Sequence, residues 1–361
     1  MNGTLSLRPR GLWLTTSLEL RQRVRSVRWY VALGVFTVVL FGIGLLALAP
    51  ALVSSEWGAV APVARVMFSL QMLLVLFAML LVTPALSAGS INGDRSAGTL
   101  ATLQASLLSP LEIVLGKLLA GLITGLAFLV LAMPSALPLA LLGHVSVFYL
   151  VRVVLMICFL TFCVTAIGLG LSAITQRQLG SVVLAYVLVF GVTVVGPILW
   201  GVSATLLHQE REVTGYHTEY DDYSSMTGGV CVAEAEVRPV WRMDLTQPLM
   251  WPNPVVMLAE TAPGQDMTAS WEDMDAENSP DVLSLLKFGM RELSSSPHPS
   301  DYNSCSPGDE NYPEDLGSPR SIPMWPMGVG AWGLLALGSL ILAVFRLAVP
   351  IKHLGKGTRI A

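Results

Sequence analysis

The chain has 361 residues, of which 53% are hydrophobic and 13% charged, and its mean hydropathy is +0.63. This composition excludes an ordinary soluble domain and supplies enough apolar sequence for several bilayer crossings of about 20 residues each. The formal net charge is −4, but 21 of the 25 acidic residues and only six of the 21 basic residues lie within 208–325. That division indicates two environments on opposite sides of a membrane rather than a nucleic-acid partner.

The N-terminal segment is basic, and we predict an interfacial amphipathic helix over 12–28. Leu20, Val24 and Val27 form an apolar line beside several arginines, as in helices that lie along a bilayer surface. The run from Thr16 to Glu19 has the pattern of a helix-starting capping box. The alternative is a basic juxtamembrane anchor with no further role.

Long segments that are almost free of charge follow, and each has the length of a transmembrane helix. We predict six spans, at 29–50, 66–88, 113–142, 146–174, 180–207 and 327–350. The predicted fold class is therefore an all-α polytopic membrane protein with six transmembrane helices, an amphipathic N-terminal helix and a large loop between helices five and six. The predicted divisions of the chain are 1–28, 29–207 (which includes the loop 89–112), 208–326 and 327–361.

Lysine and arginine indicate the orientation of these spans. With six crossings, the basic residues of the N-terminal segment, the second-to-third loop, the fourth-to-fifth turn and the tail fall on one side. The positive-inside rule makes that side cytoplasmic, so both termini lie inside and 208–326 lies outside. Arg65 and Arg152 oppose this order. We interpret them as snorkelling to the outer headgroups, with contact to an anionic substrate as the alternative.

The loop 89–112 contains two helix starts in quick succession. Ser109, Pro110 and Glu112 have the pattern of a capping box with proline at the first helical position. Upstream, an apolar stripe at i, i+3, i+7 and i+8 predicts a short amphipathic helix; it comprises Leu100, Leu103, Leu107 and Leu108. Such a helix beside a sharply capped span favours contact with a partner at the membrane face.

The same loop resembles the one between the second and third spans of ABC-2 type transporter permeases. The family pattern Glu-Arg-x-x-Gly-Thr-Leu-x-x-Leu, a Ser/Thr-Pro turn and Gly-Lys is matched from Asp94-Arg95 through Ser109-Pro110 to Gly116-Lys117. Asp94 stands where the family usually carries Glu, which keeps the charge and shortens the reach. The resemblance implies a coupling helix that docks on an ATPase, with an interface formed by Asp94, Arg95, Gly98, Thr99, Leu100, Leu103 and Leu107.

The resemblance further implies the membrane subunit of a bacterial ABC exporter, resident in the cell membrane. No Gly-x-x-x-x-Gly-Lys-Ser/Thr motif occurs in the chain, so we expect no enzyme activity and no cofactor here, with ATP and Mg²⁺ on a separate ATPase subunit. A second permease subunit, identical or different, is the other implied partner. Alternatives are a non-transporting mechanotransmitter or envelope-assembly and sensor protein with a partner-binding ectodomain, and, with little support, an intramembrane enzyme.

The segment 208–326 is predicted to be an acidic extracytoplasmic domain, disordered in part. Within it, Trp251 to Leu258 looks able to pack against the outer ends of the spans, and Asp281 to Leu293 predicts a short helix with Val282, Leu285, Leu286 and Met290 on one face. Cys231 and Cys305 are a candidate disulfide. No histidine pair has a metal-ligand spacing, so no metal site is predicted.

Overall fold

The computed structural model describes residues 7–53, 60–99, 108–219, 229–264, 279–295, 302–305, 310–313 and 322–348. Among them, six helices are long and apolar enough to cross a membrane, which confirms the predicted fold class. The spans are α2 (Val27–Val53), α3 (Val60–Ser87), α6 (Pro110–Leu142), α7 (Val147–Ile174), the continuous run α8 (Gln178–Phe190), η2 (Gly191–Val195) and α9 (Gly196–Leu206), and α12 (Trp325–Leu347).

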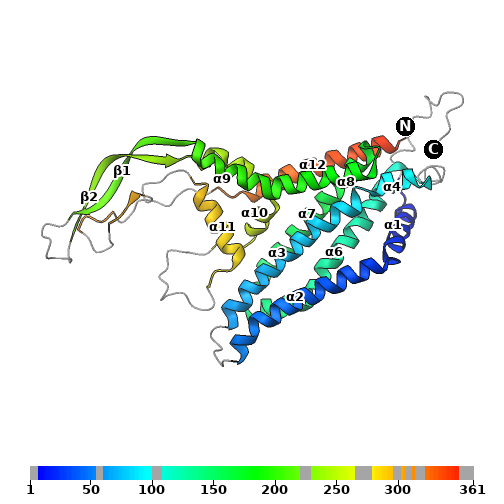
Figure 1. Cartoon of the computed structure of the whole chain (residues 1–361), viewed down its shortest axis with the longest axis horizontal. Helices are drawn as coiled ribbons and strands as arrows, with labels where there is room; N and C mark the ends of the chain where they lie inside the picture. Colours follow the sequence, from blue (N-terminus) through cyan, green and yellow to red (C-terminus); the bar gives the residue numbers. More distant parts are fainter. Residues whose placement is uncertain are drawn as a thin grey trace.

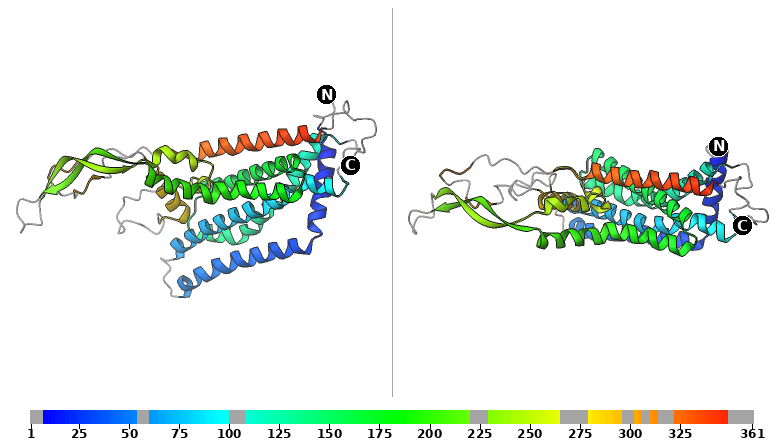
Figure 2. Two further views of the ribbon diagram at one scale, coloured as in Figure 1. Left: turned by 45° about the horizontal axis from the view of Figure 1, so that its top comes forward. Right: turned by 90° about the horizontal axis from the view of Figure 1, so that it is seen from above.

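The spans lie roughly side by side, with α1 (Pro9–Val24), α4 (Ser90–Ser96) and the last turn of α12 at one end of the bundle (Figure 1). A long β-hairpin projects from the opposite end (Figure 2). Helix α12 packs along α7, and α3 packs against α6 and α7. Small residues permit this approach: a Cβ at Gly170 would lie 2.6 Å from the Cβ of Ser339, as expected where helices associate in lipid.

Helix α3 begins six residues before the predicted start of the second span, so Arg65 lies within the helix. Its side chain does not snorkel. Arg65 is 7% exposed and donates from Nε to the carbonyl of Gly143 and from Nη1 to the carbonyl of Ser279, both at 2.9 Å. The guanidinium donates to backbone carbonyls of two segments at this end of the bundle, so the predicted snorkelling of Arg65 is wrong.

Helix α1 also begins earlier than predicted. Its first residue is Pro9, at the position where proline is best tolerated in a helix. The predicted capping box from Thr16 to Glu19 is therefore wrong, because both residues lie in mid-helix. The hydroxyl of Thr16 donates to the carbonyl of Leu12 at 2.8 Å instead.

The two faces of α1 have different surroundings. The face against α6 is small and polar, with Gly11, Thr15, Thr16 and Glu19 buried. Trp13 and Leu14 are largely exposed, and Leu18 is about half exposed. An apolar outer face with a tryptophan suits a helix that lies in the membrane interface.

The fifth span contains a π-helical turn, η2, which the sequence analysis did not predict. Asn253 contacts it. The amide Nδ2 donates to the carbonyls of Val192 and Thr193 at 3.1 and 3.2 Å, while Oδ1 accepts from the amides of Val255 and Val256. A π turn displaces backbone bonding, and one buried side chain here both satisfies that turn and caps α10 (Pro254–Ala259).

The element from Trp251 to Leu258 packs against the spans, as predicted. Four consecutive residues of α10 are buried among α3, α7 and α12. The indole of Trp332 donates to the carbonyl of Pro252 at 2.7 Å, and Gly328 lies too close to the carbonyl of Trp251 to carry a side chain.

The predicted short helix is present as α11 (Val282–Leu293), with Asp281 as its N-cap. Its predicted apolar face is partly wrong: Leu283 is fully buried, whereas Leu285 is 51% exposed. Asp281 accepts two hydrogen bonds, from the amide of Ser284 and from the hydroxyl of Tyr149 on α7, both at 2.7 Å. That second bond fixes α11 to the bundle.

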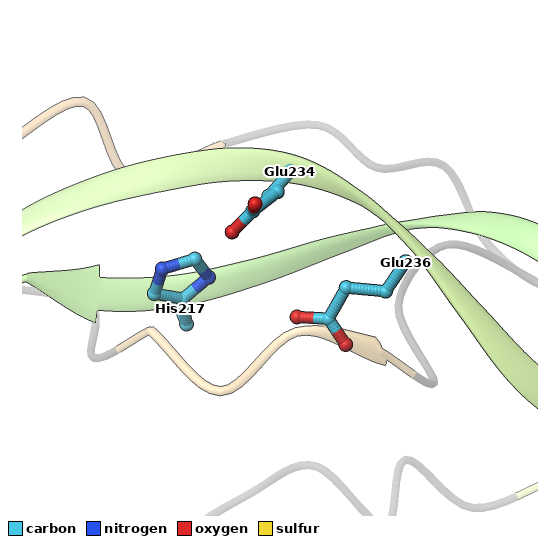
Figure 3. A group of neighbouring side chains, drawn as sticks. All are labelled: His217, Glu234 and Glu236. Atoms are coloured by element: carbon cyan, nitrogen blue, oxygen red, sulfur yellow. The ribbon is translucent and has the colours of Figure 1, made fainter.

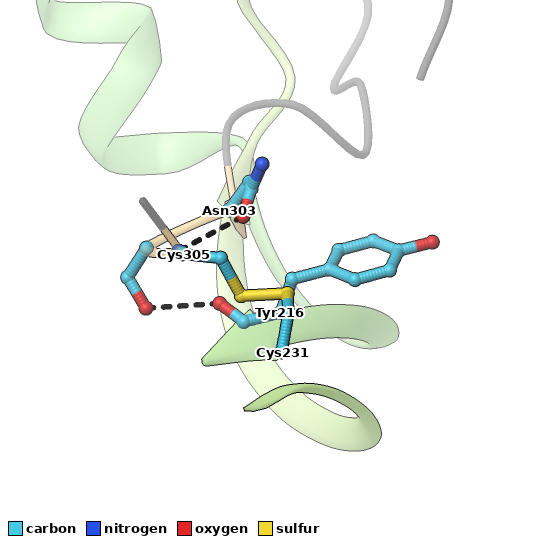
Figure 4. The surroundings of a disulfide bond; sticks show 5 residues. Tyr216, Cys231, Asn303 and Cys305 are labelled. Atoms are coloured by element: carbon cyan, nitrogen blue, oxygen red, sulfur yellow. Dashed lines mark hydrogen bonds between the residues drawn. A yellow bond between two sulfur atoms is a disulfide. The ribbon is translucent and has the colours of Figure 1, made fainter. Parts of the chain in front are cut away.

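The projecting hairpin consists of β1 (His208–Glu219) and β2 (Val230–Trp241), paired antiparallel from His208–Trp241 to Glu219–Val230. No strand was predicted there, because acidic residues interrupt the apolar alternation that normally identifies one. A disulfide joins Cys231 to Cys305 with the Cα atoms 5.7 Å apart (Figure 4). Beside it, the amide of Ser304 donates to the carbonyl of Tyr216 at 2.8 Å, so the hairpin gains a third backbone partner.

Replacing Asn253 with alanine leaves two span carbonyls and two α10 amides without this partner. We expect the variant to lose about 1–3 kcal/mol of stability, measured as a lower midpoint of thermal unfolding in detergent. Gln209→Ala, which removes an exposed amide on β1, should leave the midpoint unchanged. Equal midpoints for the two variants would contradict the role given to Asn253.

Candidate coupling site

The structure describes four of the seven residues predicted to form the ATPase interface. Asp94 and Arg95 lie in α4, and Gly98 and Thr99 follow it. The other three, Leu100, Leu103 and Leu107, lie outside the described residues. The predicted capping box at Ser109 is confirmed: its hydroxyl accepts from the amide of Glu112 at 3.1 Å, and the Glu112 carboxylate accepts from the Ser109 amide at 2.8 Å.

Helix α4 is attached to the end of α7. The hydroxyl of Ser172 accepts from the amides of Ile91 and Asn92, both at 3.1 Å, which satisfies donors at the start of α4. The side chain of Asn92 donates to the hydroxyl of Thr175 at 2.8 Å. Arg95 donates to Asn92 Oδ1 at 3.1 Å and to the Thr175 carbonyl at 3.3 Å. Arg95 thus orders the loop within its own chain.

The turn after α4 needs glycine. Gly98 has φ of +73°, in the left-handed region that other residues adopt at a cost of about 1–2 kcal/mol. Its amide donates to the carbonyl of Arg95 at 3.2 Å. Thr99 follows and donates to Asp94 Oδ1 at 3.2 Å. Gly98 and Thr99 therefore form the turn that ends α4.

A buried ion cluster lies beside α4. Lys117, on the first turns of α6, has a side chain that is only 2% exposed, and it pairs with Glu19 of α1 and with Asp94 of α4, the latter at 2.5 Å. Arg23 of α1 lies 3.9 Å from Glu19. We call these four residues the Lys117 cluster. Its two cations balance its two anions, as a buried group of charges requires.

Arg23 also joins the cluster to the spans. Its guanidinium donates to the hydroxyl of Thr124 at 3.0 Å and to the carbonyl of Ala120 at 3.4 Å, both on α6. Burial lowers the pKa of Arg23 below its ordinary value, and the charge of Glu19 opposes that shift. Arginine remains charged under these conditions because its pKa starts so high.

Glu112 connects the start of α6 to the start of α1. It is fully buried, and Oε1 accepts from the backbone amide of Arg8 at 2.6 Å. Below it, α1 and α6 approach so closely that a Cβ at Gly116 would overlap the side chain of Thr15. The Gly116-Lys117 pair therefore has two structural functions: glycine lets α1 approach, and lysine forms the ion cluster.

A groove of about 860 Å³ opens beside α4 at the turn between α7 and α8. Its floor is polar where α4 contributes and apolar where α8 contributes. The exposed Arg177 and Leu179 lie on its rim. The lining residues are Asn92, Arg95, Ser96, Gln176, Arg177, Gln178, Leu179, Gly180, Val183 and Leu184.

The sequence analysis missed three members of the Lys117 cluster: Glu19, Arg23 and Lys117. It assigned Glu19 to a helix cap, took Lys117 only as part of a motif, and placed Asp94 in the predicted ATPase interface without its partner Lys117. The signal was present: lysine and glutamate at the edges of apolar segments are costly to bury unless they pair. Their pairing partners could not be read, because 98 positions separate Glu19 from Lys117.

A polytopic helical bundle with an interfacial helix, a capped loop and a charged cluster at one face is typical of a membrane transport component. A family model described as ABC-2 family transporter protein matches residues 13–274. The chain belongs to this family: it is a multi-pass membrane protein and the permease component of an ABC transporter, and its family associates with an ABC ATPase. No curated protein matched the sequence.

The cluster makes a sharp stability prediction. Lys117→Met leaves the buried cluster with two carboxylates and one cation, Arg23, which we expect to cost about 3–5 kcal/mol as a lower midpoint of thermal unfolding in detergent. Adding Asp94→Asn to the same chain should restore most of the loss, because Glu19 keeps Arg23 as its partner. Arg21→Met, on the exposed face of α1, is the matched control. A double variant no more stable than Lys117→Met would contradict the pairing.

Proposed function

We propose that this permease is the membrane subunit of an exporter in the cell membrane, and that its ATPase docks on the cytoplasmic end of the bundle. The docking surface comprises the segment 99–109 together with the groove beside α4. ATP hydrolysis on the partner then moves the spans, and substrate leaves on the side of the β-hairpin.

The observation that carries the proposal is the Lys117 cluster. The buried ammonium group of Lys117, a residue of α6, pairs with the carboxylates of Glu19 on α1 and Asp94 on α4. Arg95 and Asn92 add α7 to the same unit. A displacement of the loop after α4 therefore moves α1, α4, α6 and α7 together. Separating these helices would leave a buried charge without its partner.

The loop itself supplies the contact. Leu100, Leu103 and Leu107 form an apolar stripe in the sequence, and a groove on a soluble ATPase is the usual acceptor for such a stripe. Gly98 and Thr99 set where the chain leaves α4. We propose that Asp94 acts indirectly, since its carboxylate is committed to Lys117 and holds α4 in place.

A second permease subunit completes the proposal. Helices α2, α8 and α9 present many exposed apolar side chains, and in a membrane these contact lipid or another subunit. The family resemblance implies that two such permease chains, identical or different, form one translocation path. The bilayer covers the remaining apolar surface.

The orientation can be tested by cysteine labelling with a membrane-impermeant reagent in intact cells. Ser295→Cys, after α11, should react, whereas Ser96→Cys at the end of α4 and Ser6→Cys should react only after permeabilisation. The positive-inside distribution of lysine and arginine is the reason. Labelling of Ser96→Cys in intact cells would reverse the proposed topology.

Docking is tested by the amount of ATPase that co-purifies with the chain from native membranes. Leu103→Glu places a carboxylate in an apolar contact, a penalty of several kcal/mol, or on the order of a thousandfold in affinity. Arg177→Glu reverses a charge on the groove rim and should reduce co-purification at least tenfold, or about 1.4 kcal/mol.

Arg152→Glu is the matched control, because this exposed arginine of α7 lies toward the opposite end of the bundle. It should leave the amount of co-purified ATPase unchanged. Retention of a full complement of ATPase by both Leu103→Glu and Arg177→Glu would remove the docking surface from the proposal.

A second candidate function is a non-transporting mechanotransmitter. The β-hairpin favours it, since two 12-residue strands extend roughly 40 Å and a disulfide secures them. An ATPase-driven ectodomain of this kind would change its distance from the bundle with nucleotide while reconstituted vesicles show no flux. Substrate flux in such vesicles favours the exporter.

A further inference from the structure

The β-hairpin brings together three side chains that the sequence keeps apart. His217 lies on β1, and Glu234 and Glu236 lie on β2. In the register, Val232 pairs with His217, so the residues two and four positions along β2 project from the same face. One ligand atom from each residue lies within 4.8 Å of the other two. Figure 3 shows the imidazole and both carboxylates converging.

The imidazole carries a second indication of a ligand. Nδ1 of His217 is buried and has no hydrogen-bond partner among the described residues. A buried polar atom without a partner is costly and calls for an explanation, such as a bound ion. A metal at this cluster fixes the imidazole in one tautomer and removes the need for a proton on the ligating nitrogen.

Gly215 lets the carboxylate of Glu236 lie close to the backbone of β1. Gly215 pairs with Glu234 across the hairpin, and a Cβ at Gly215 would lie 3.5 Å from the carboxylate of Glu236. A larger side chain at position 215 would occupy the space that the Glu236 carboxylate fills. The disulfide at Cys231 and the bonds to Tyr216 hold the strands next to the cluster.

We propose that His217, Glu234 and Glu236 bind a divalent transition-metal ion, with Zn²⁺ the best-fitting case. One imidazole and two carboxylates are a mixed nitrogen and oxygen set that suits Zn²⁺, whereas Ca²⁺ and Mg²⁺ prefer oxygen alone. Ligand atoms around tetrahedral Zn²⁺ lie about 3.3–3.5 Å apart. The glutamates reach that spacing by rotating their flexible side chains, and water completes the coordination.

One neighbour competes with the metal. Arg238 donates to Glu236 Oε2 at 2.6 Å, and both side chains are partly exposed. An exposed pair of this kind is weak, so a divalent cation displaces it. Removing the arginine should therefore strengthen metal binding, an effect that a purely structural role for these residues would not produce.

The test uses the full chain, purified in detergent and stripped with a chelator. Zn²⁺ is titrated against a chromophoric competitor, with Ca²⁺ titrated separately. We expect one tight equivalent of Zn²⁺ in the wild type. His217→Ala and Glu234→Gln should each weaken it at least tenfold, and Arg238→Gln should tighten it severalfold. His208→Ala, an exposed histidine on the same strand, should change nothing.

Two results would overturn the proposal. The first is a Zn²⁺ affinity that is the same in the wild type, His217→Ala and Arg238→Gln, which would show that Zn²⁺ binds at another site. The second is Ca²⁺ binding as tight as Zn²⁺, which indicates only an acidic surface. If His217→Ala fails to form its disulfide or elutes as aggregate, Arg238→Gln decides the question, because an exposed arginine can be removed without loss of fold.

Discussion

The ammonium group of Lys117 constrains the end of the bundle that carries α1 and α4 more than any other group described. Its side chain is 2% exposed, and a charge so deeply buried persists only with opposite charges in contact. Glu19 and Asp94 supply them from two other elements. Separating α1 from α6, or moving α4 away from α6, would therefore break an ion pair and leave a buried charge without its partner. The close approach at Gly116 and the capping of Glu112 depend on the same juxtaposition.

The opposite end of the bundle uses single hydrogen-bonding side chains for a comparable purpose. Asn253 joins the segment before α10 to the π turn of the fifth span, and Asp281 joins α11 to Tyr149 of α7. Helix α7 thus contacts both ends: its last turn holds α4 through Ser172, and its first turns hold α11. Displacement of α4 therefore has a continuous helical route to α11 at the opposite end of the bundle.

The spans could be predicted because uninterrupted apolar length is a strong signal that needs no tertiary information. The capping box at Ser109 was also predictable, since its partners lie three residues apart. The hairpin was not, because acidic side chains on both strands hide the alternation on which strand prediction depends. The π turn was missed for a related reason: its stabilising partner, Asn253, lies some 60 positions away in sequence.

The coupling site shows the same limit at the level of single residues. The motif placed Asp94, Arg95 and Gly98 in the correct loop, but it could not reveal that both charged side chains face inward. Asp94 binds Lys117, and Arg95 binds Asn92 and Thr175. These two residues order the loop within the chain. A local motif cannot show this, because Lys117 and Thr175 lie far from the loop in sequence.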